Sequence, residues 1–236
     1  MRIPRDILRN VLIPMISYFD LDTFLNGLGM SPTDQQSIKK IEHERRLTFI
    51  GHGYYIEYLI ENICHREDGP AVIYASDSSE VFSEAIGTRE WYQNGKKHRL
   101  DGPAVICQNG DEEWWVNNEL HRLDGPAVKC PDGYQEYYLH GKLHRVNGPA
   151  MIWSDGRKVY WVNNLRHRKN GPAIIEPDGS REWFLNDKRH RLNGPAIVTK
   201  QIREWWVNGQ RHRLDGPAVV APKRKEYWVN GEKQVR

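Results

Sequence analysis

From residue 54 to the end of the chain, two short hydrophobic runs alternate with polar turns, and the pattern returns after about 23 residues. One run carries two adjacent aromatic residues and the other follows a Gly-Pro-Ala step, as in EWWVNNELHRLDGPAVKCPDG. Runs this short, bounded by Gly, Asn and Asp, are typical of β-strands joined by tight turns. The pattern therefore predicts a mainly β fold, an elongated antiparallel sheet built from stacked β-hairpins.

The motif H-R-x-(D/N)-G-P-A marks each copy and occurs seven times between residues 65 and 218. Its successive Gly-Pro steps, from Gly69 to Gly216, lie 33, 23, 23, 23, 23 and 22 residues apart. Asn-Gly or Asn-Asn precedes most copies, where a tight turn needs residues that tolerate positive φ. A single copy is too small to bury an apolar face alone, so about seven units are expected to form one array over residues 47–236.

An aromatic pair precedes the motif in every copy but the first. Because neighbouring residues of a strand point to opposite faces, we expect two aromatic columns, one on each face of the sheet. Offset ring contacts would add about 0.5–1.5 kcal/mol per pair beyond area burial. We therefore predict a structural role for the pairs, which are Trp91-Tyr92, Trp114-Trp115, Tyr137-Tyr138, Tyr160-Trp161, Trp183-Phe184, Trp205-Trp206 and Tyr227-Trp228.

The step from the first copy to the second is ten residues longer than the next step, 33 against 23. The extra residues lie within 74–89 and are mostly polar. A deviant unit near one end of an array can be a cap or a contact loop, and the sequence leaves both interpretations open.

Residues 1–46 lack the repeat and carry helical signals instead. Pro4 suits the first turn of a helix that has an apolar side made of Ile3, Ile7, Leu8, Val11 and Leu12. Pro14 interrupts this helix, a second helix is expected around Phe24, and a third, polar helix is expected from Ser31 to about Arg46. We therefore predict a small helical N-terminal domain.

Charge and cysteine content exclude several classes of partner and site. The formal net charge of +3 comes from acidic and basic residues mixed along the chain, so no strong field for nucleic acid or membrane is expected. Three cysteines without C-x-x-C spacing predict neither a disulfide framework nor a zinc knuckle, and indicate a reducing compartment. The start MRIPRDILRN does not fit a signal peptide, and the longest apolar stretch, 11–19, is too short to span a bilayer. We expect a soluble protein that is not secreted.

A histidine followed by arginine recurs in every copy, which raises the question of catalysis or metal binding. Equivalent histidines in successive hairpins would lie two strands apart, about 9–10 Å, whereas nitrogens that share a zinc ion each lie about 2.0–2.1 Å from it. A sevenfold ladder also lacks the non-equivalent roles of an active site. We expect no catalytic residue, cofactor or metal, and a structural role in binding turns of the same or adjacent copy for His98, His121, His144, His167, His190 and His212.

A row of arginines beside aromatic rings could also follow a phosphate backbone. Two residues after each of these arginines stands Asp in four copies and Asn in three, which neutralises much of the row. We therefore expect no nucleic-acid partner.

The stretch YWVNNLRHRKNGPAIIEPDG, residues 160–179, resembles the MORN repeat, whose unit is a β-hairpin. The resemblance covers about residues 54–236 and is closest to a variant form, with H-R-x-D-G-P-A where the usual repeat has a shorter H-G-x-G step. It implies a single-layer sheet that acts as a scaffold. Weak lipid contact stays open for such proteins, although no membrane insertion is expected.

At the N-terminus, I-P-x-D-I-L-x-x-V-L followed by Phe19-Asp20-Leu21 resembles an F-box, the helical module that docks onto the adaptor subunit of cullin-RING ubiquitin ligases. The resemblance implies a partner-binding face made of Ile3, Pro4, Ile7, Leu8, Val11, Leu12, Phe19 and Leu21. The alternative is a helical cap that covers the open edge of the sheet.

F-box-like starts joined to MORN-variant arrays resemble repeat proteins of large DNA viruses of protists. Two hypotheses follow. One is a non-enzymatic adaptor in the host cytoplasm that binds a ligase adaptor and a captured protein. The other is a structural component of the virion, in which the array bridges capsid proteins or assists assembly. Neither the partner nor the oligomeric state can be read from the sequence.

Overall fold

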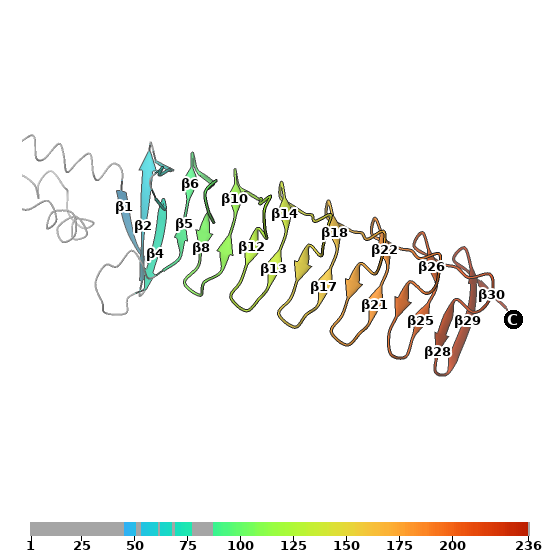
Figure 1. Cartoon of the computed structure of the whole chain (residues 1–236). Coiled ribbons are helices and arrows are strands. Elements are labelled where there is room, and N and C mark those ends of the chain that lie inside the picture. The colour runs from blue at the N-terminus through green and yellow to red at the C-terminus, as the bar shows by residue number, and fades with distance from the viewer. Residues whose placement is uncertain (1–44, 51–52, 61, 68, 77–86, 236) are drawn as a thin grey trace, which may run out of the picture. The chain divides into compact units, whose positions relative to one another are not determined.

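A computed structural model describes residues 45–50, 53–60, 62–67, 69–76 and 87–235. These residues belong to two compact units, one reaching residue 110 and including 115–118, the other made of 111–114 and 119 onward. The described residues form antiparallel β-hairpins and include no helix, which confirms the predicted mainly β array (Figure 1). The expected helical domain, with its candidate partner-binding residues, lies outside the described residues. Its third helix would have to end by residue 44, because Arg45 and Arg46 already belong to a strand.

The first unit contains a five-stranded antiparallel sheet in the order β1-β2-β4-β5-β8. Its strands are β1 (Arg45–Ile50), β2 (Gly53–Ile60), β4 (Val72–Ser76), β5 (Arg89–Glu90) and β8 (Val105–Ile106). Beyond the sheet, β3 (Ile63–Cys64) pairs with the end of β2, and β6 (Tyr92–Gln93) pairs with β7 (Lys96–Lys97). Strand β10 (Trp115–Val116) also belongs to this unit. The long insertion predicted within 74–89 falls mostly on residues that are not described.

The second unit continues the same pattern, and its strands pair in chain order. The sheet consists of β9 (Glu112–Glu113), β12 (Val128–Lys129), β13 (Gln135–Glu136), β16 (Met151–Ile152), β17 (Lys158–Val159), β20 (Ile174–Ile175), β21 (Arg181–Glu182), β24 (Ile197–Val198), β25 (Arg203–Glu204), β28 (Val219–Ala221) and β29 (Arg224–Val229). Each copy therefore adds two strands to a long antiparallel sheet of stacked hairpins.

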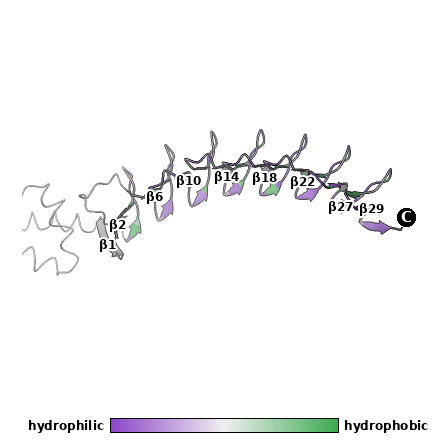
Figure 2. Cartoon of the chain, turned by 90° about the horizontal axis from the view of Figure 1, so that it is seen from below, coloured by the Kyte–Doolittle hydropathy of each residue, from purple (hydrophilic) through white to green (hydrophobic). Residues whose placement is uncertain are grey.

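A smaller two-stranded hairpin extends each copy beyond this sheet (Figure 2). In the second unit these hairpins are β14 (Tyr138–Leu139) with β15 (Lys142–Leu143), β18 (Trp161–Val162) with β19 (Leu165–Arg166), β22 (Phe184–Leu185) with β23 (Lys188–Arg189), β26 (Trp206–Val207) with β27 (Gln210–Arg211), and β29 with β30 (Glu232–Gln234). Strand β11 (Glu119–Leu120) occupies the same place in its own copy.

The first aromatic residue of each pair lies where the chain passes from the sheet to the small hairpin. The Tyr160 backbone N–H donates to the carbonyl of Ala173, and the Tyr160 carbonyl accepts from the N–H of His167. Tight turns close the hairpins, with Asn163 at φ 52° and Asn164 at φ 61°. Residues with positive φ at both positions match the twist of the strands, as the Asn-rich sequence predicts.

The core consists of small pieces, one in each copy. The motif alanine is fully buried in every copy, and its carbonyl accepts a hydrogen bond from the backbone N–H of the aromatic residue that begins the same copy's small hairpin. These alanines are Ala71, Ala104, Ala127, Ala150, Ala173, Ala196 and Ala218. A larger apolar cluster forms around Val159, Ile174 and Phe184 in the second unit.

Candidate interaction surface

The histidine of each motif joins its copy to the next one. His167 Nδ1 accepts a hydrogen bond from the Asn186 backbone N–H at 3.3 Å and lies 2.7 Å from Asn186 Oδ1. The other pairs of the same kind are His65 with Asn94, His98 with Asn117, His144 with Asn163, His190 with Asn208 and His212 with Asn230. The described residues contain no group of three or more His, Cys, Asp or Glu that could hold a metal ion. In the pairs named above, each histidine ring contacts a turn residue of the adjacent copy.

The arginine of each motif is held between an aromatic ring and a glycine. The Arg122 guanidinium lies 3.9 Å from the centre of the Trp114 ring and donates to the Pro126 carbonyl at 3.2 Å. On its other side it is so close to Gly125 that a Cβ there would lie 2.9 Å from Arg122 Cζ. The same guanidinium-over-ring contact recurs in all seven copies. This arrangement explains why Arg, Gly and Pro recur together.

The second aromatic residue of most pairs is covered by a basic side chain from the preceding copy. Arg166 lies 4.1 Å from the centre of the Phe184 ring, and Lys97 lies 5.6 Å from that of Trp115. The expectation that rings stack on rings in two columns is therefore wrong for the described residues, where a cation from the preceding copy lies over the second ring at Trp115, Phe184, Trp206 and Trp228. Within the two described units, the ring contacts are instead Tyr55 with Tyr74, His121 with His140, and Tyr134 with Trp153.

One motif position supports neither the core nor the turns. The residue after the arginine is aliphatic in five copies, and its side chain projects into solvent: Leu100 is 80% exposed, Leu123 84%, Val146 73%, Leu192 73% and Leu214 71%. We call Leu123, Val146, Leu192 and Leu214 of the second unit the aliphatic row. In its middle, Lys169 takes the equivalent position. Sequence reasoning missed this row because it treated the position as variable, although its hydrophobic content was visible.

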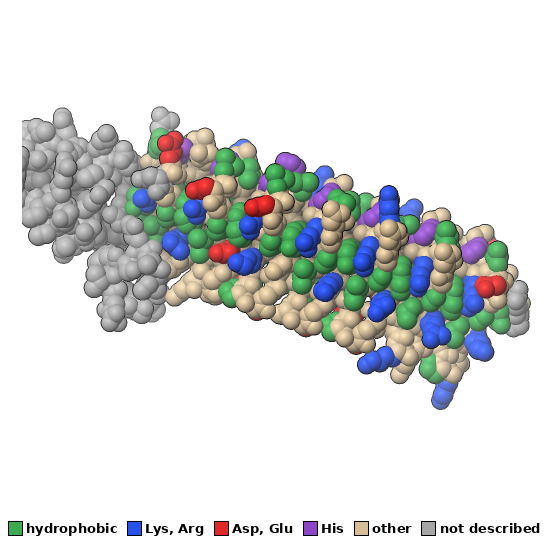
Figure 3. Space-filling model, in the orientation of Figure 1, with side chains coloured by type: hydrophobic (Ala, Val, Ile, Leu, Met, Phe, Trp, Pro, Cys, Tyr) green, Lys and Arg blue, Asp and Glu red, His purple; other side chains and the backbone are tan. Residues whose placement is uncertain are grey.

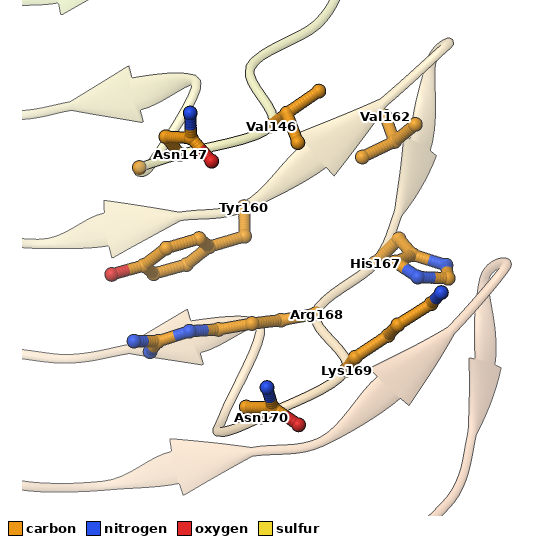
Figure 4. A pocket seen from close by; sticks show the side chains of 9 residues that line it. Val146, Asn147, Tyr160, Val162, His167, Arg168, Lys169 and Asn170 are labelled. Atoms are coloured by element: carbon orange, nitrogen blue, oxygen red, sulfur yellow. The ribbon is translucent and has the colours of Figure 1, made fainter.

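Hollows lie beside the row, between consecutive copies. One has a volume of about 530 Å³ and lies between the loop of Val146 and Asn147 in one copy and the side chains of Tyr160, Arg168 and Lys169 in the next (Figure 4). Another, of about 360 Å³, repeats this position one copy earlier. The two hollows therefore occupy equivalent positions in consecutive copies of the second unit.

The charge beside the arginines differs between copies. Arg99, Arg122 and Arg213 each donate from Nε to the aspartate two residues later at 2.9 Å. These bonds, first among the causes, hold the pKa of Asp101, Asp124 and Asp215 below its ordinary value.

In the three central copies, Asn147, Asn170 and Asn193 replace the aspartate. Arg145, Arg168 and Arg191 still donate to the proline carbonyl, but within the described residues no acceptor faces their Nε. Over the hairpins of β14, β18 and β22, the upper part of the face in Figure 3 shows basic and hydrophobic side chains without acidic ones. These three copies of the second unit therefore lack the carboxylate that pairs with the motif arginine in the copies on either side.

Comparison of this chain with protein-family models, with curated proteins and with solved structures gave no match. The repetitive array of antiparallel hairpins is compatible with a MORN-like repeat. Within the described residues, no helix has the length and apolar character needed to cross a membrane.

Proposed function

We propose that this protein is a non-enzymatic scaffold that binds other proteins through the aliphatic row. The observation that carries the proposal is the exposure of an aliphatic side chain at one motif position in copy after copy, from 71% at Leu214 to 84% at Leu123. Single exposed aliphatic residues are ordinary on protein surfaces, so the argument rests on their recurrence at one motif position, which forms a candidate interaction surface. A repeat array presents such side chains at a fixed spacing, which suits an extended partner.

The test is affinity purification of the full chain followed by mass spectrometry, with a variant in which Leu123, Val146, Leu192 and Leu214 are all replaced by Ser. Because these side chains are exposed, the variant should keep its fold, as checked by thermal melting. We expect it to lose partners that a control variant, Leu165→Ser at an exposed position of strand β19, retains. Identical partner sets for both variants would refute the proposed role of the row.

The F-box-like start supports one form of this scaffold, an adaptor in the host cytoplasm that brings a captured protein to a ubiquitin ligase. In this form, Leu8 and Leu12 dock on the ligase adaptor and the array binds the captured protein. Leu8→Glu combined with Leu12→Glu should abolish pull-down of the ligase adaptor and leave the melting temperature of the array unchanged. A lower melting temperature of the variant, with no ligase adaptor bound by the native chain, would favour the helical cap, since burying unpaired carboxylates destabilises the folded state.

A second form is a structural protein of a virion. It is favoured by the repetition of similar exposed side chains along the second unit, which suits contact with a regular lattice of capsid proteins. The two forms differ in where the chain is found. Recovery of the protein in stoichiometric amounts from purified particles would support the virion role, whereas recovery only with soluble ligase subunits would support the adaptor.

A further inference from the structure

We infer that the three central copies of the array bind an acidic, apolar segment of a partner protein. The contact would be made by the guanidinium groups of Arg145, Arg168 and Arg191 and the ammonium group of Lys169, with Val146 and Leu192 as apolar contacts. This inference rests on the proposed scaffold function and specifies the chemistry of the partner.

The first argument is the unsatisfied charge of these arginines. In other copies an aspartate accepts from Nε at 2.9 Å, as Asp124 does from Arg122. Asparagine in the same place removes that carboxylate, and Arg168 keeps only the bond from its terminal nitrogen to the Pro172 carbonyl, at 3.1 Å. A carboxylate from a partner can take the place that the aspartate holds elsewhere, because charge-assisted hydrogen bonds of this kind are roughly twice as strong as neutral ones.

The second argument is the way in which the aliphatic row is interrupted. Lys169 replaces the aliphatic residue in the middle one of the three copies that lack aspartate, and its side chain lies beside the hollow of about 530 Å³ (Figure 4). Arg168 and Asn170 line the same hollow. Figure 4 shows the Arg168 guanidinium beside the Tyr160 ring and the Lys169 ammonium pointing the opposite way, beside His167. Carboxylates of an extended segment could therefore reach each basic group separately, while Val146 on the same rim offers an apolar contact. The substitutions that raise the positive charge thus gather at one place.

The surroundings favour a protein segment over a nucleic acid. Equivalent residues of successive copies lie two strands apart, so the three arginines span about 19 Å. Asp124 and Asp215, whose side chains are 83% and 82% exposed, stand in copies on either side and would repel a phosphate backbone that continued past this span. Val146 and Leu192, each 73% exposed, would also gain nothing from phosphates. A short segment with both carboxylates and aliphatic side chains matches all these groups.

The test is fluorescence anisotropy with a labelled peptide of about 18 residues that repeats Asp-Leu-Glu, a length that more than covers the three copies. Two peptides of equal length isolate its features: one repeats Asn-Leu-Gln and lacks charge, and one repeats Asp-Ser-Glu and lacks the apolar side chain. We expect the acidic, apolar peptide to bind about tenfold more tightly than either control, and its binding to weaken with added salt.

A variant of the chain supplies the matched control. Asn147→Asp with Asn170→Asp and Asn193→Asp recreates the Arg-Asp pairs of other copies, so it should fold normally and weaken binding of the acidic peptide about tenfold. Asp124→Asn should do the opposite, because it frees one more guanidinium beside the central copies.

Equal binding of the acidic and neutral peptides, or no effect of the triple variant, would overturn the inference and leave the scaffold function standing. Tighter binding of a single-stranded oligonucleotide of similar length would overturn it in favour of nucleic acid. No binding of any peptide would also overturn it, and the scaffold function would then be judged separately by the partner sets of the aliphatic-row variant.

Discussion

Arg122 stacks on Trp114, with its guanidinium carbon 3.9 Å from the centre of the indole ring, and both residues belong to the same copy. Gly125 closes the other side, where a Cβ would come within 2.9 Å of that carbon. A cation over an aromatic ring contributes about 0.5–2 kcal/mol, depending on its exposure. The first aromatic residue of each pair therefore stabilises its copy from within, through that copy's own arginine.

Because the Arg122 guanidinium lies between the Trp114 ring and Gly125, we expect Gly125→Ala to destabilise the protein by displacing this guanidinium. The added methyl group would displace the guanidinium from the ring and from the Pro126 carbonyl, which should cost about 1–2 kcal/mol of unfolding free energy. Urea denaturation measures the loss. The backbone itself is not the cause, because Gly125 does not adopt the left-handed conformation that would strain an alanine.

Arg122→Ala is the control for this prediction, in a double-mutant cycle. In that background nothing remains for the methyl group to displace, so Gly125→Ala should cost almost nothing more, and a coupling energy of about 1 kcal/mol is expected. Additive losses would show that glycine is required at this position for some reason other than space for the guanidinium.

The hairpins and their turns could be predicted because they follow from local rules. Asn163 and Asn164, for example, adopt the positive φ that their place between two hydrophobic runs predicts. The role of Gly125 could not be predicted, because the Arg122 side chain lies against this glycine only in the folded turn. The sequence also did not show which aromatic residue is covered by which cation, since Arg166 reaches Phe184 from a different copy.

The aliphatic row was missed for a different reason. Leu123 lies between charged residues in the sequence, where a single aliphatic residue carries little signal, and only its 84% exposure sets it apart from a core residue. The replacement of Asp by Asn in three copies was visible in the sequence. Its meaning became clear only from the hydrogen bond of Arg122 to Asp124, because the copies with Asn lack the carboxylate that accepts this bond.

Trp161 and Trp206 should respond differently to replacement by Phe. Trp206 Nε1 donates to Glu204 at 2.9 Å, whereas Val159 takes the place of that glutamate beside Trp161, and the buried Trp161 Nε1 has no acceptor. An unsatisfied buried donor costs about 1–3 kcal/mol. Trp161→Phe removes it, and Trp206→Phe breaks a bond. We expect Trp206→Phe to be the more destabilising variant by about 1 kcal/mol in urea denaturation.

Because both substitutions remove the same ring volume, each serves as the control for the other. Equal losses in the two variants would mean that the indole N–H groups contribute nothing to stability. Phe stands naturally at the equivalent position 184 and is 3% exposed there, so the smaller ring fits this place in the fold.

Phe184 should be among the strongest contributors to stability in the second unit. It is buried in the cluster with Val159 and Ile174, so Phe184→Ala should cost about 3–5 kcal/mol. Trp228→Ala, at the equivalent position of the last copy, should cost less because a terminal unit has one neighbour. Denaturant melts of both variants test this, and equal, small losses would contradict a role for these rings in holding the array together.

His121 is expected to make the array sensitive to acid. Its Nδ1 accepts a hydrogen bond from the His140 backbone N–H at 3.2 Å, but His140 stands where most other copies have an asparagine, whose Oδ1 could accept a hydrogen bond from the protonated ring. Burial, followed by the repulsion of His140, lowers the pKa of His121 below its ordinary value of 6.5, although Glu119 acts in the other direction. The folded state therefore favours the neutral ring.

The sign of the pH dependence follows from that shift. The contribution of the neutral His121 ring to the free energy of unfolding is fully present above 6.5, the pKa of this histidine in the unfolded chain. It is lost as the pH falls through the lower pKa of the folded state, because the unfolded chain binds the proton more readily. Melting temperatures measured between about pH 8 and pH 5 should therefore fall toward acid in the native chain. In His140→Asn, the amide oxygen can accept a hydrogen bond from the protonated His121 ring. The decrease in melting temperature that is due to His121 should therefore be smaller, and NMR titration should show a higher pKa for His121. An unchanged His121 pKa in that variant would refute the assigned roles of His140 and the missing amide.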